Sequence, residues 1–193
     1  MANFVVVAFA ASAGGINALM ALLEGLPPDF PAAVVIVQHL DPRHKSLMAD
    51  IMQRHCALKV KQADEGDLIA AGNVYIAPPN RHVLVTPGKT LTLSDSELVH
   101  FVRPSADLLF ESVATSFKER GIAVVLTGTG FDGAMGVTAV KKMGGMVIAQ
   151  DKATAEFPGM PSAAIATGDV DFELPLGEIA DALVKLMGDD GHE

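Results

Sequence analysis

Cysteine is almost absent from the sequence, since Cys56 is the only one among 193 residues. A lone thiol cannot close an intramolecular disulfide, and it excludes a metal site built from several cysteines. No two histidines are spaced as metal ligands on one helix face. We therefore expect a cytoplasmic protein with no bound metal.

Long apolar runs are also missing. The run near the start of the chain, Phe4–Ala11, is short and has no basic residue before it. A helix that spans a bilayer needs about 20 apolar residues, and a secretory signal has a basic first part. The sequence therefore predicts neither a targeting segment nor membrane insertion.

Basic residues are few beside the acidic ones. The chain has 14 Lys and Arg against 23 Asp and Glu, a net charge of −9. This balance argues against general binding to nucleic acid or to an anionic membrane. Hydrophobic residues, by contrast, make up 50% of the chain, which excludes disorder. We find no internal repeat or linker, and we expect residues 1–193 to form one domain.

Strand and helix patterns alternate along most of the chain. Apolar runs predict strands at Phe4–Ala10, Ala33–Val37, Ile122–Leu126 and Met146–Ala149. Helical spacing predicts helices at 16–26, Ser46–His55, Ser105–Arg120, Ala134–Lys142, Pro161–Ala166 and Leu176–Met187. Such alternation indicates an α/β fold with a doubly wound, mostly parallel sheet and helices on both faces.

Residues 57–98 interrupt this alternation. Short apolar stretches follow one another there, separated by Gly and Pro, and Pro87-Gly88-Lys89 is typical of a hairpin turn. We expect an antiparallel hairpin excursion at one edge of the sheet.

Three predicted strands are followed by residues that can do chemistry. Ser12 follows the first strand, His39 follows the second, and Asp132 lies in the turn after Ile122–Leu126. In open α/β sheets, sites form beyond the carboxyl ends of the strands. A serine nucleophile needs a base, most often a histidine that a carboxylate orients. The pattern predicts a Ser12–His39–Asp132 triad.

Each of these residues also has a simpler interpretation, which the sequence leaves open. Ser12 could cap the first helix, His39 could bond only to backbone, and Asp132 could cap the helix after it. The triad is favoured because the apolar runs contain no other polar residue.

The glycine-rich turn after the first strand has two interpretations. A dinucleotide site is disfavoured, because Ala and Ser stand where the first two glycines of G-x-G-x-x-G belong. An oxyanion hole of backbone N–H groups is favoured. Its candidate residues are Ala13 and Gly14 in this turn, with Thr129 and Gly130 in the turn that contains Asp132.

At these residues the sequence resembles the catalytic domain of the CheB family, the protein-glutamate methylesterases of bacterial chemotaxis. The resemblance runs from about Phe4 to Met187. Its motifs are AASAGG at Ser12, VIVQHL at His39, VYIAPPNRH at 74–82, RPSADLLF from Arg103, VLTGTGFDGAMG at Asp132, and IAQDKAT with FPGMPSAAI from Ile148.

The resemblance implies a serine esterase without a cofactor. Ser12 would be the nucleophile, His39 the base and then the acid, and Asp132 the residue that orients His39. The substrates would be methylated glutamates on the cytoplasmic helices of chemoreceptors, with release of methanol. Some family members also deamidate receptor glutamines. The family places the turn at Met160 near the active site, which makes Met160 a candidate substrate-binding residue.

The chain departs from the family pattern in three places. Ala13 replaces a common threonine, and Thr129 and Phe131 stand where many members have Met and Asn. These changes lie beside the predicted oxyanion hole, so they leave rate and specificity open. The usual receiver domain has no counterpart here. A stand-alone esterase, a part of a longer protein, and a partnership with a separate receiver-domain protein all stay open.

Two rival functions also remain: a catalytically inactive binding module of a signalling complex, and a general small-ester hydrolase. Basic residues near the predicted site are a further feature. Arg43, Arg81 and Arg103 could form a rim that attracts acidic receptor helices, or they could be ordinary solvated charges.

Overall fold

Seven parallel strands form the central sheet of the structure, a computed structural model that describes residues 4–43 and 45–189. The strand order is β3-β4-β2-β1-β7-β8-β9, and each neighbouring pair runs parallel. The strands are β1 (Val5–Ala11), β2 (Ala32–Gln38), β3 (Lys59–Gln62), β4 (Asn73–Ile76), β7 (Gly121–Val125), β8 (Met146–Gln150) and β9 (Phe172–Leu174). The doubly wound α/β fold expected from the alternation is confirmed.

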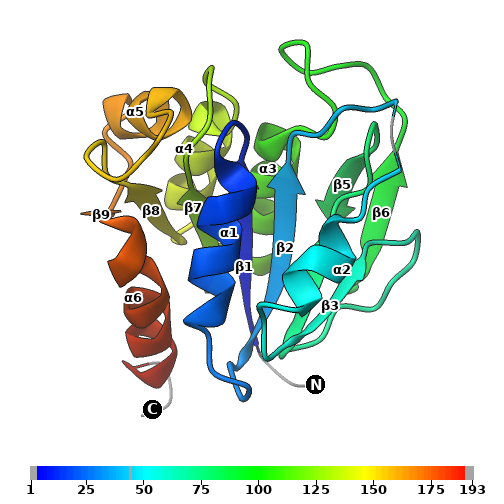
Figure 1. Cartoon of the computed structure of the whole chain (residues 1–193), viewed down its shortest axis with the longest axis horizontal. Helices are drawn as coiled ribbons and strands as arrows, with labels where there is room; N and C mark the ends of the chain where they lie inside the picture. Colours follow the sequence, from blue (N-terminus) through cyan, green and yellow to red (C-terminus); the bar gives the residue numbers. More distant parts are fainter. Residues whose placement is uncertain (1–3, 44, 190–193) are drawn as a thin grey trace.

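Helices cover both faces of this sheet (Figure 1). They are α1 (Gly15–Glu24), α2 (Met48–Gln53), α3 (Ala106–Phe117), α4 (Ala134–Lys142), α5 (Gly159–Ala166) and α6 (Leu176–Asp189), with a 3₁₀ turn at Lys118–Arg120. One core cluster joins the sheet to α1, α2 and α6, and the other joins it to α3, α4 and α5. Strands β1, β2 and β7 lie between the two clusters and are almost wholly buried, which explains why their sequences are apolar on both faces.

The middle of the chain differs in part from the sequence-based expectation. Only β5 (His82–Val85) and β6 (Leu91–Ser94) form an antiparallel hairpin, as a separate two-stranded sheet around the predicted turn. The hairpin packs its buried side chains into the same cluster as α3. The preceding strands β3 and β4 instead pair in parallel at the edge of the main sheet. The Gly and Pro residues between these short stretches indicate where the strands end, but they do not indicate whether neighbouring strands run parallel or antiparallel.

The order of the strands creates a switch point at the centre of the sheet. From β1 the chain moves to β2 on one side, and it later returns to β7 on the other side of β1. The carboxyl ends of these three strands are therefore neighbours, which is where ligands bind in open α/β sheets. Within the described residues, no helix has the length and apolar character required to cross a bilayer.

Candidate active site

Ser12 lies directly after β1, in the tight turn that leads into α1. Its N–H donates to the carbonyl of Thr127 at 3.0 Å, and its carbonyl accepts from the N–H of Gly15 at 2.8 Å. Gln38 Nε2 also donates to that carbonyl at 2.8 Å. The helix N-cap is Gly14, which has no side-chain cap. The backbone of Ser12 is thus fixed, while its hydroxyl is not used to cap the helix.

Gly15 is required at the start of α1. A Cβ atom at this position would lie 2.0 Å from Gln38 Oε1 and 2.7 Å from the Ala11 methyl carbon. The absence of a side chain lets the Gln38 amide pass over the turn and reach the carbonyls of both Ser12 and His39. Gly15 therefore allows the close packing of the ends of β1 and β2.

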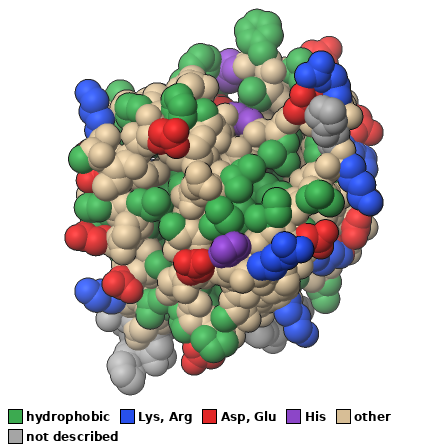
Figure 2. All heavy atoms as spheres, viewed as in Figure 1, with side chains coloured by type: hydrophobic (Ala, Val, Ile, Leu, Met, Phe, Trp, Pro, Cys, Tyr) green, Lys and Arg blue, Asp and Glu red, His purple; other side chains and the backbone are tan. Residues whose placement is uncertain are grey.

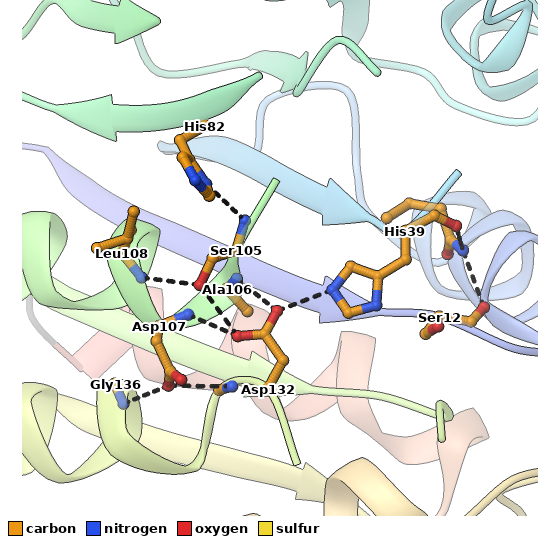
Figure 3. Close-up of polar contacts among 11 residues, drawn as sticks. Ser12, His39, His82, Ser105, Ala106, Asp107, Leu108, Asp132 and Gly136 are labelled. Carbon is orange, nitrogen blue, oxygen red and sulfur yellow. Dashed lines mark hydrogen bonds and ion pairs between the residues drawn. The ribbon is translucent and has the colours of Figure 1, made fainter. Parts of the chain in front are cut away.

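His39 is held between the other two residues of the predicted triad. Its N–H extends the parallel ladder by donating to the Ala11 carbonyl at 3.1 Å. Its ring nitrogen Nε2 lies 2.8 Å from Oδ2 of Asp132. Figure 3 shows the ring between the Asp132 carboxylate and Ser12. With Nε2 engaged by the carboxylate, Nδ1 is the nitrogen left for the serine.

Asp132 is buried, and it caps a helix other than the one that follows it. Its carboxylate accepts from the Ala106 N–H at 2.7 Å and from the Asp107 N–H at 3.1 Å. The Ser105 hydroxyl donates to it at 3.2 Å. These groups form the N-terminus of α3, whereas, among the described residues, Asp132 accepts no hydrogen bond from α4, whose N-cap residue is Gly133. The interpretation of Asp132 as a cap for α4 was therefore wrong.

The environment of Asp132 keeps it charged. Burial raises the pKa of its carboxyl. The hydrogen bonds from His39 and from the backbone N–H groups of Ala106 and Asp107 lower this pKa, and together they outweigh the effect of burial. The net pKa lies below the ordinary value for aspartate. An ionised carboxylate at this position holds the proton on Nε2 of His39 and stabilises the imidazolium.

Asp107 forms the reciprocal cap. Its Oδ1 accepts from the N–H groups of Gly133 and Gly136, at 3.0 and 2.8 Å, at the start of α4. Burial raises its pKa, the Gly136 N–H opposes that effect, and the charge of Asp132 adds to it, so the net pKa is raised. Its Oδ2 is buried and has no hydrogen-bond partner among the described residues. The two carboxylates thus tie the starts of α3 and α4 together around the site.

A pocket of about 270 Å³ joins the three predicted catalytic residues. Its lining comprises Ser12, His39, His100, Val102, Thr129, Gly130, Phe131 and Asp132. Thr129 and Gly130 lie in this lining, whereas Ala13 and Gly14 do not. Among the described residues, none accepts a hydrogen bond from the backbone N–H of any of these four residues. The oxyanion hole therefore stays a prediction. Of its four candidate residues, only Thr129 and Gly130 border the pocket.

Met160 lies behind the pocket instead of in its wall. Its side chain is fully buried, and its N–H donates to the Gly128 carbonyl at 2.8 Å. A Cβ atom at Gly128 would lie 2.4 Å from Met160 Sδ and 2.9 Å from Ser12 Cβ. The expectation of a substrate-binding role for Met160 is therefore corrected. The residue supports the Gly128 backbone, which in turn packs against Ser12.

The three predicted rim arginines are already engaged within the protein. Arg43 forms a bidentate ion pair with Asp41, and Arg81 pairs with Asp95 at 2.9 Å. Arg103 donates to Asn80 Oδ1 and to two backbone carbonyls. The ion pairs of Arg43 and Arg81 leave little net positive charge for steering an acidic partner, whereas Arg103, whose acceptors are neutral, keeps its charge.

A buried histidine was missed by the sequence analysis. His82 has no exposed surface, and its Nδ1 accepts from the Ser105 N–H at 3.0 Å (Figure 3). Its Nε2 lies 2.9 Å from the Glu97 carbonyl, so this nitrogen is the one that holds the proton. His82 thereby links the β5–β6 hairpin to the serine that donates to Asp132. In the sequence, the only signal for His82 is its position at the end of the VYIAPPNRH motif. Its contact with Ser105 joins residues 23 positions apart, so no local pattern indicates it.

A second groove lies away from this site. Figure 2 shows hydrophobic side chains gathered over the face between α1 and α2. The groove there, of about 250 Å³, is lined by Ile16, Leu40, Asp41, Lys45, Ser46, Leu47, Met48 and Ile51. It shares no residue with the triad pocket and offers few groups for chemistry. In the part of the chain that the structure describes, no three His, Cys, Asp or Glu residues are grouped to hold a metal ion.

The switch point and the Ser–His–Asp arrangement define an α/β protein with the side-chain set that serine hydrolases use. The sequence model of the CheB methylesterase family matches residues 7–183. The chain belongs to this family, as its motifs indicated. Its fold matches the crystal structure of the Thermotoga maritima CheB methylesterase catalytic domain. The TM-score is 0.92 at 37% identity, over 96% of this chain and 100% of that one.

The chain covers two of its relatives to different extents. A Leptospira interrogans protein named putative protein-glutamate methylesterase/protein-glutamine glutaminase is 41% identical over 184 residues, 95% of each chain. A Pyrococcus horikoshii protein-glutamate methylesterase/protein-glutamine glutaminase is 41% identical over 186 residues, 95% of this chain but 50% of the relative. The chain thus spans nearly the whole of one relative and half of the other.

Proposed function

We propose that this protein is a cytoplasmic esterase that hydrolyses glutamyl methyl esters on chemoreceptor helices. The observation that supports this most directly is the 2.8 Å contact between His39 and Asp132 in a pocket that also contains Ser12. The names of the relatives supply the class of ester. On this proposal the receptor is the macromolecular partner, and no cofactor takes part.

The first half of the reaction transfers the glutamyl group to the enzyme. His39 Nδ1 removes the proton of Ser12 Oγ, and the oxygen forms a bond with the ester carbonyl carbon. We expect the backbone N–H groups of Thr129 and Gly130, two residues that line the same pocket, to stabilise the oxyanion. The imidazolium then gives its proton to the methoxy oxygen, the C–O bond breaks, and methanol leaves.

The second half returns the enzyme to its starting state. His39 takes a proton from water, the hydroxide adds to the acyl carbon, and the bond to Ser12 breaks as the proton returns to Oγ. The product is the free glutamate side chain. A glutamine side chain would follow the same course, with ammonia as the leaving group in place of methanol.

The test is methanol release from membranes that contain methylated receptor. Wild type should release methanol, and Ser12→Ala should lose about 10⁴-fold or more in rate while remaining folded, because the base then has no proton to take. Ser162→Ala is the matched control, since this serine is exposed on α5 outside the pocket.

Two outcomes would contradict the proposal. A Ser12→Ala rate within tenfold of wild type would exclude the serine as nucleophile. Wild type that cleaves a small neutral methyl ester but leaves methylated receptor intact would instead indicate a general small-ester hydrolase.

A further inference from the structure

The loop between β6 and α3 holds a large aromatic side chain out in water. Figure 1 shows this loop extending past the carboxyl ends of the central strands. Phe101, near its middle, is 94% exposed, the highest value for a large hydrophobic residue in the described chain. Leu98 in the same loop and Phe131 beside it are each more than half exposed. A single exposed apolar side chain is ordinary, but three large ones gathered at one end of the molecule are typical of a surface that a partner covers.

The backbone at Phe101 is also held in an unfavourable conformation. Val99 and Val102 exchange both N–H···O bonds at 3.0 Å, which closes a two-residue hairpin. Its two central residues, His100 and Phe101, have φ angles of 48° and 69°. Turns of this type favour Asn-Gly, because a bulky side chain with positive φ is strained. The loop therefore presents a phenylalanine where a glycine would suit the turn better.

The base of this hairpin is firmly held. Arg103 donates to Asn80 Oδ1 and to the carbonyls of Asp95 and Ser96, at 2.8 to 3.0 Å. On the side of the pocket, the His100 ring meets the Phe131 ring edge-on, with 4.9 Å between centroids. These contacts hold the backbone of the hairpin, and with it the point from which the Phe101 side chain projects, at a defined place.

The exposed ring lies along a continuation of the triad pocket. A neighbouring pocket of about 350 Å³ is lined by His39, Leu40, Pro42, Asn80, Leu98, Phe101, Val102 and Arg103. It shares His39 and Val102 with the pocket that contains Ser12. A polypeptide whose ester side chain enters the triad pocket must continue outside it. The adjoining pocket offers such a chain an apolar wall that ends at Phe101.

We propose that Phe101 is a specificity residue that packs against an apolar side chain of the polypeptide substrate, beside the ester-bearing residue. The substrate segment that suits this surface is an amphipathic helix, because such a helix presents an acidic or esterified side chain and an apolar neighbour on one face. Apolar contact supplies the recognition at Phe101, because the nearby cation Arg81 is paired with Asp95, and the Arg103 guanidinium is engaged by Asn80 and two backbone carbonyls at the base of the hairpin. This inference rests on the proposed function, and it names the feature that separates a protein substrate from a small ester.

The experiment compares two substrates across variants of Phe101. The substrates are methylated receptor and N-acetyl-glutamate γ-methyl ester, and the readout is the ratio of their kcat/KM values. Phe101→Ala and Phe101→Asn should lower this ratio by about tenfold or more, mainly through KM for the receptor. Phe101→Trp should restore most of it. Phe172→Ala is the matched control, because that ring is 42% exposed on edge strand β9, away from the pocket.

The Asn variant separates recognition from folding. Asparagine tolerates positive φ, so Phe101→Asn should unfold at the same or a higher denaturant concentration than wild type. An unchanged ratio in both Phe101→Ala and Phe101→Asn would overturn the inference while the proposed function stands. Wild type that releases methanol from neither substrate would refute the proposed function, and this inference with it.

Discussion

Replacing Asp132 tests the structural and the chemical role of one carboxylate separately. In Asp132→Ala, the N–H groups of Ala106 and Asp107 lose their acceptor at the buried start of α3. A buried donor left without a partner costs about 1–3 kcal/mol, so the two together cost roughly 2–6 kcal/mol. Against a typical total of about 5–15 kcal/mol, this change should be large in equilibrium denaturation.

Asp132→Asn should lose less stability than Asp132→Ala but should still lose most of its activity. The amide oxygen can still accept one of the two N–H groups of α3, so the loss of stability should be smaller than in the Ala variant. The amide also lacks the charge, and with its NH₂ at the position of Oδ2 it donates to Nε2 of His39. The proton then moves to Nδ1, where it blocks removal of the serine proton, and kcat should fall by about 10⁴-fold.

The assay pairs denaturation with methanol release at saturating substrate. Asp50→Asn is the control, because Asp50 is an exposed carboxylate in the first turn of α2. An Asn variant within tenfold of wild-type kcat would refute the role of Asp132 in setting the state of His39. An Ala variant as stable as wild type would refute the capping role.

Three further predictions concern the surroundings of this carboxylate. Gly128→Ala should lower kcat roughly 100-fold with an unchanged circular dichroism spectrum, since the new methyl group must displace Ser12 or Met160. Because the folded-state pKa of Asp132 is lowered, its contribution to stability should be complete above about pH 4, the unfolded value, and be lost as pH falls through the lower folded value. A denaturation series in pH that shows no such loss, relative to Asp132→Asn, would contradict this. The raised pKa of Asp107 acts in the opposite direction: ionisation of its carboxyl destabilises the fold, and this penalty should disappear as pH falls through the raised folded value to below about 4, the unfolded value, so the stability of wild type relative to Asp107→Asn should rise over that range.

The sequence by itself determined the fold class and the ends of the strands that matter most. Apolar runs such as that of β2, buried along its whole length, predict central parallel strands because only strands covered on both faces can be apolar throughout. The position of Ser12, His39 and Asp132 at strand ends was readable for the same reason. The start of α3 was also readable, because its N-cap residue Ser105 accepts from the Leu108 N–H only three positions away, and such capping is a local interaction.

Tertiary structure alone decided how these residues are connected. Nothing local in the sequence shows that Asp132 caps α3 instead of α4, or that Asp107 caps α4 in return, since these bonds join residues 26 to 29 positions apart. The parallel pairing of β3 with β4, and the burial of Met160 behind Gly128, also depend on packing between distant segments. Short-range patterns set which side chains are available, whereas the order of the strands sets which of them meet.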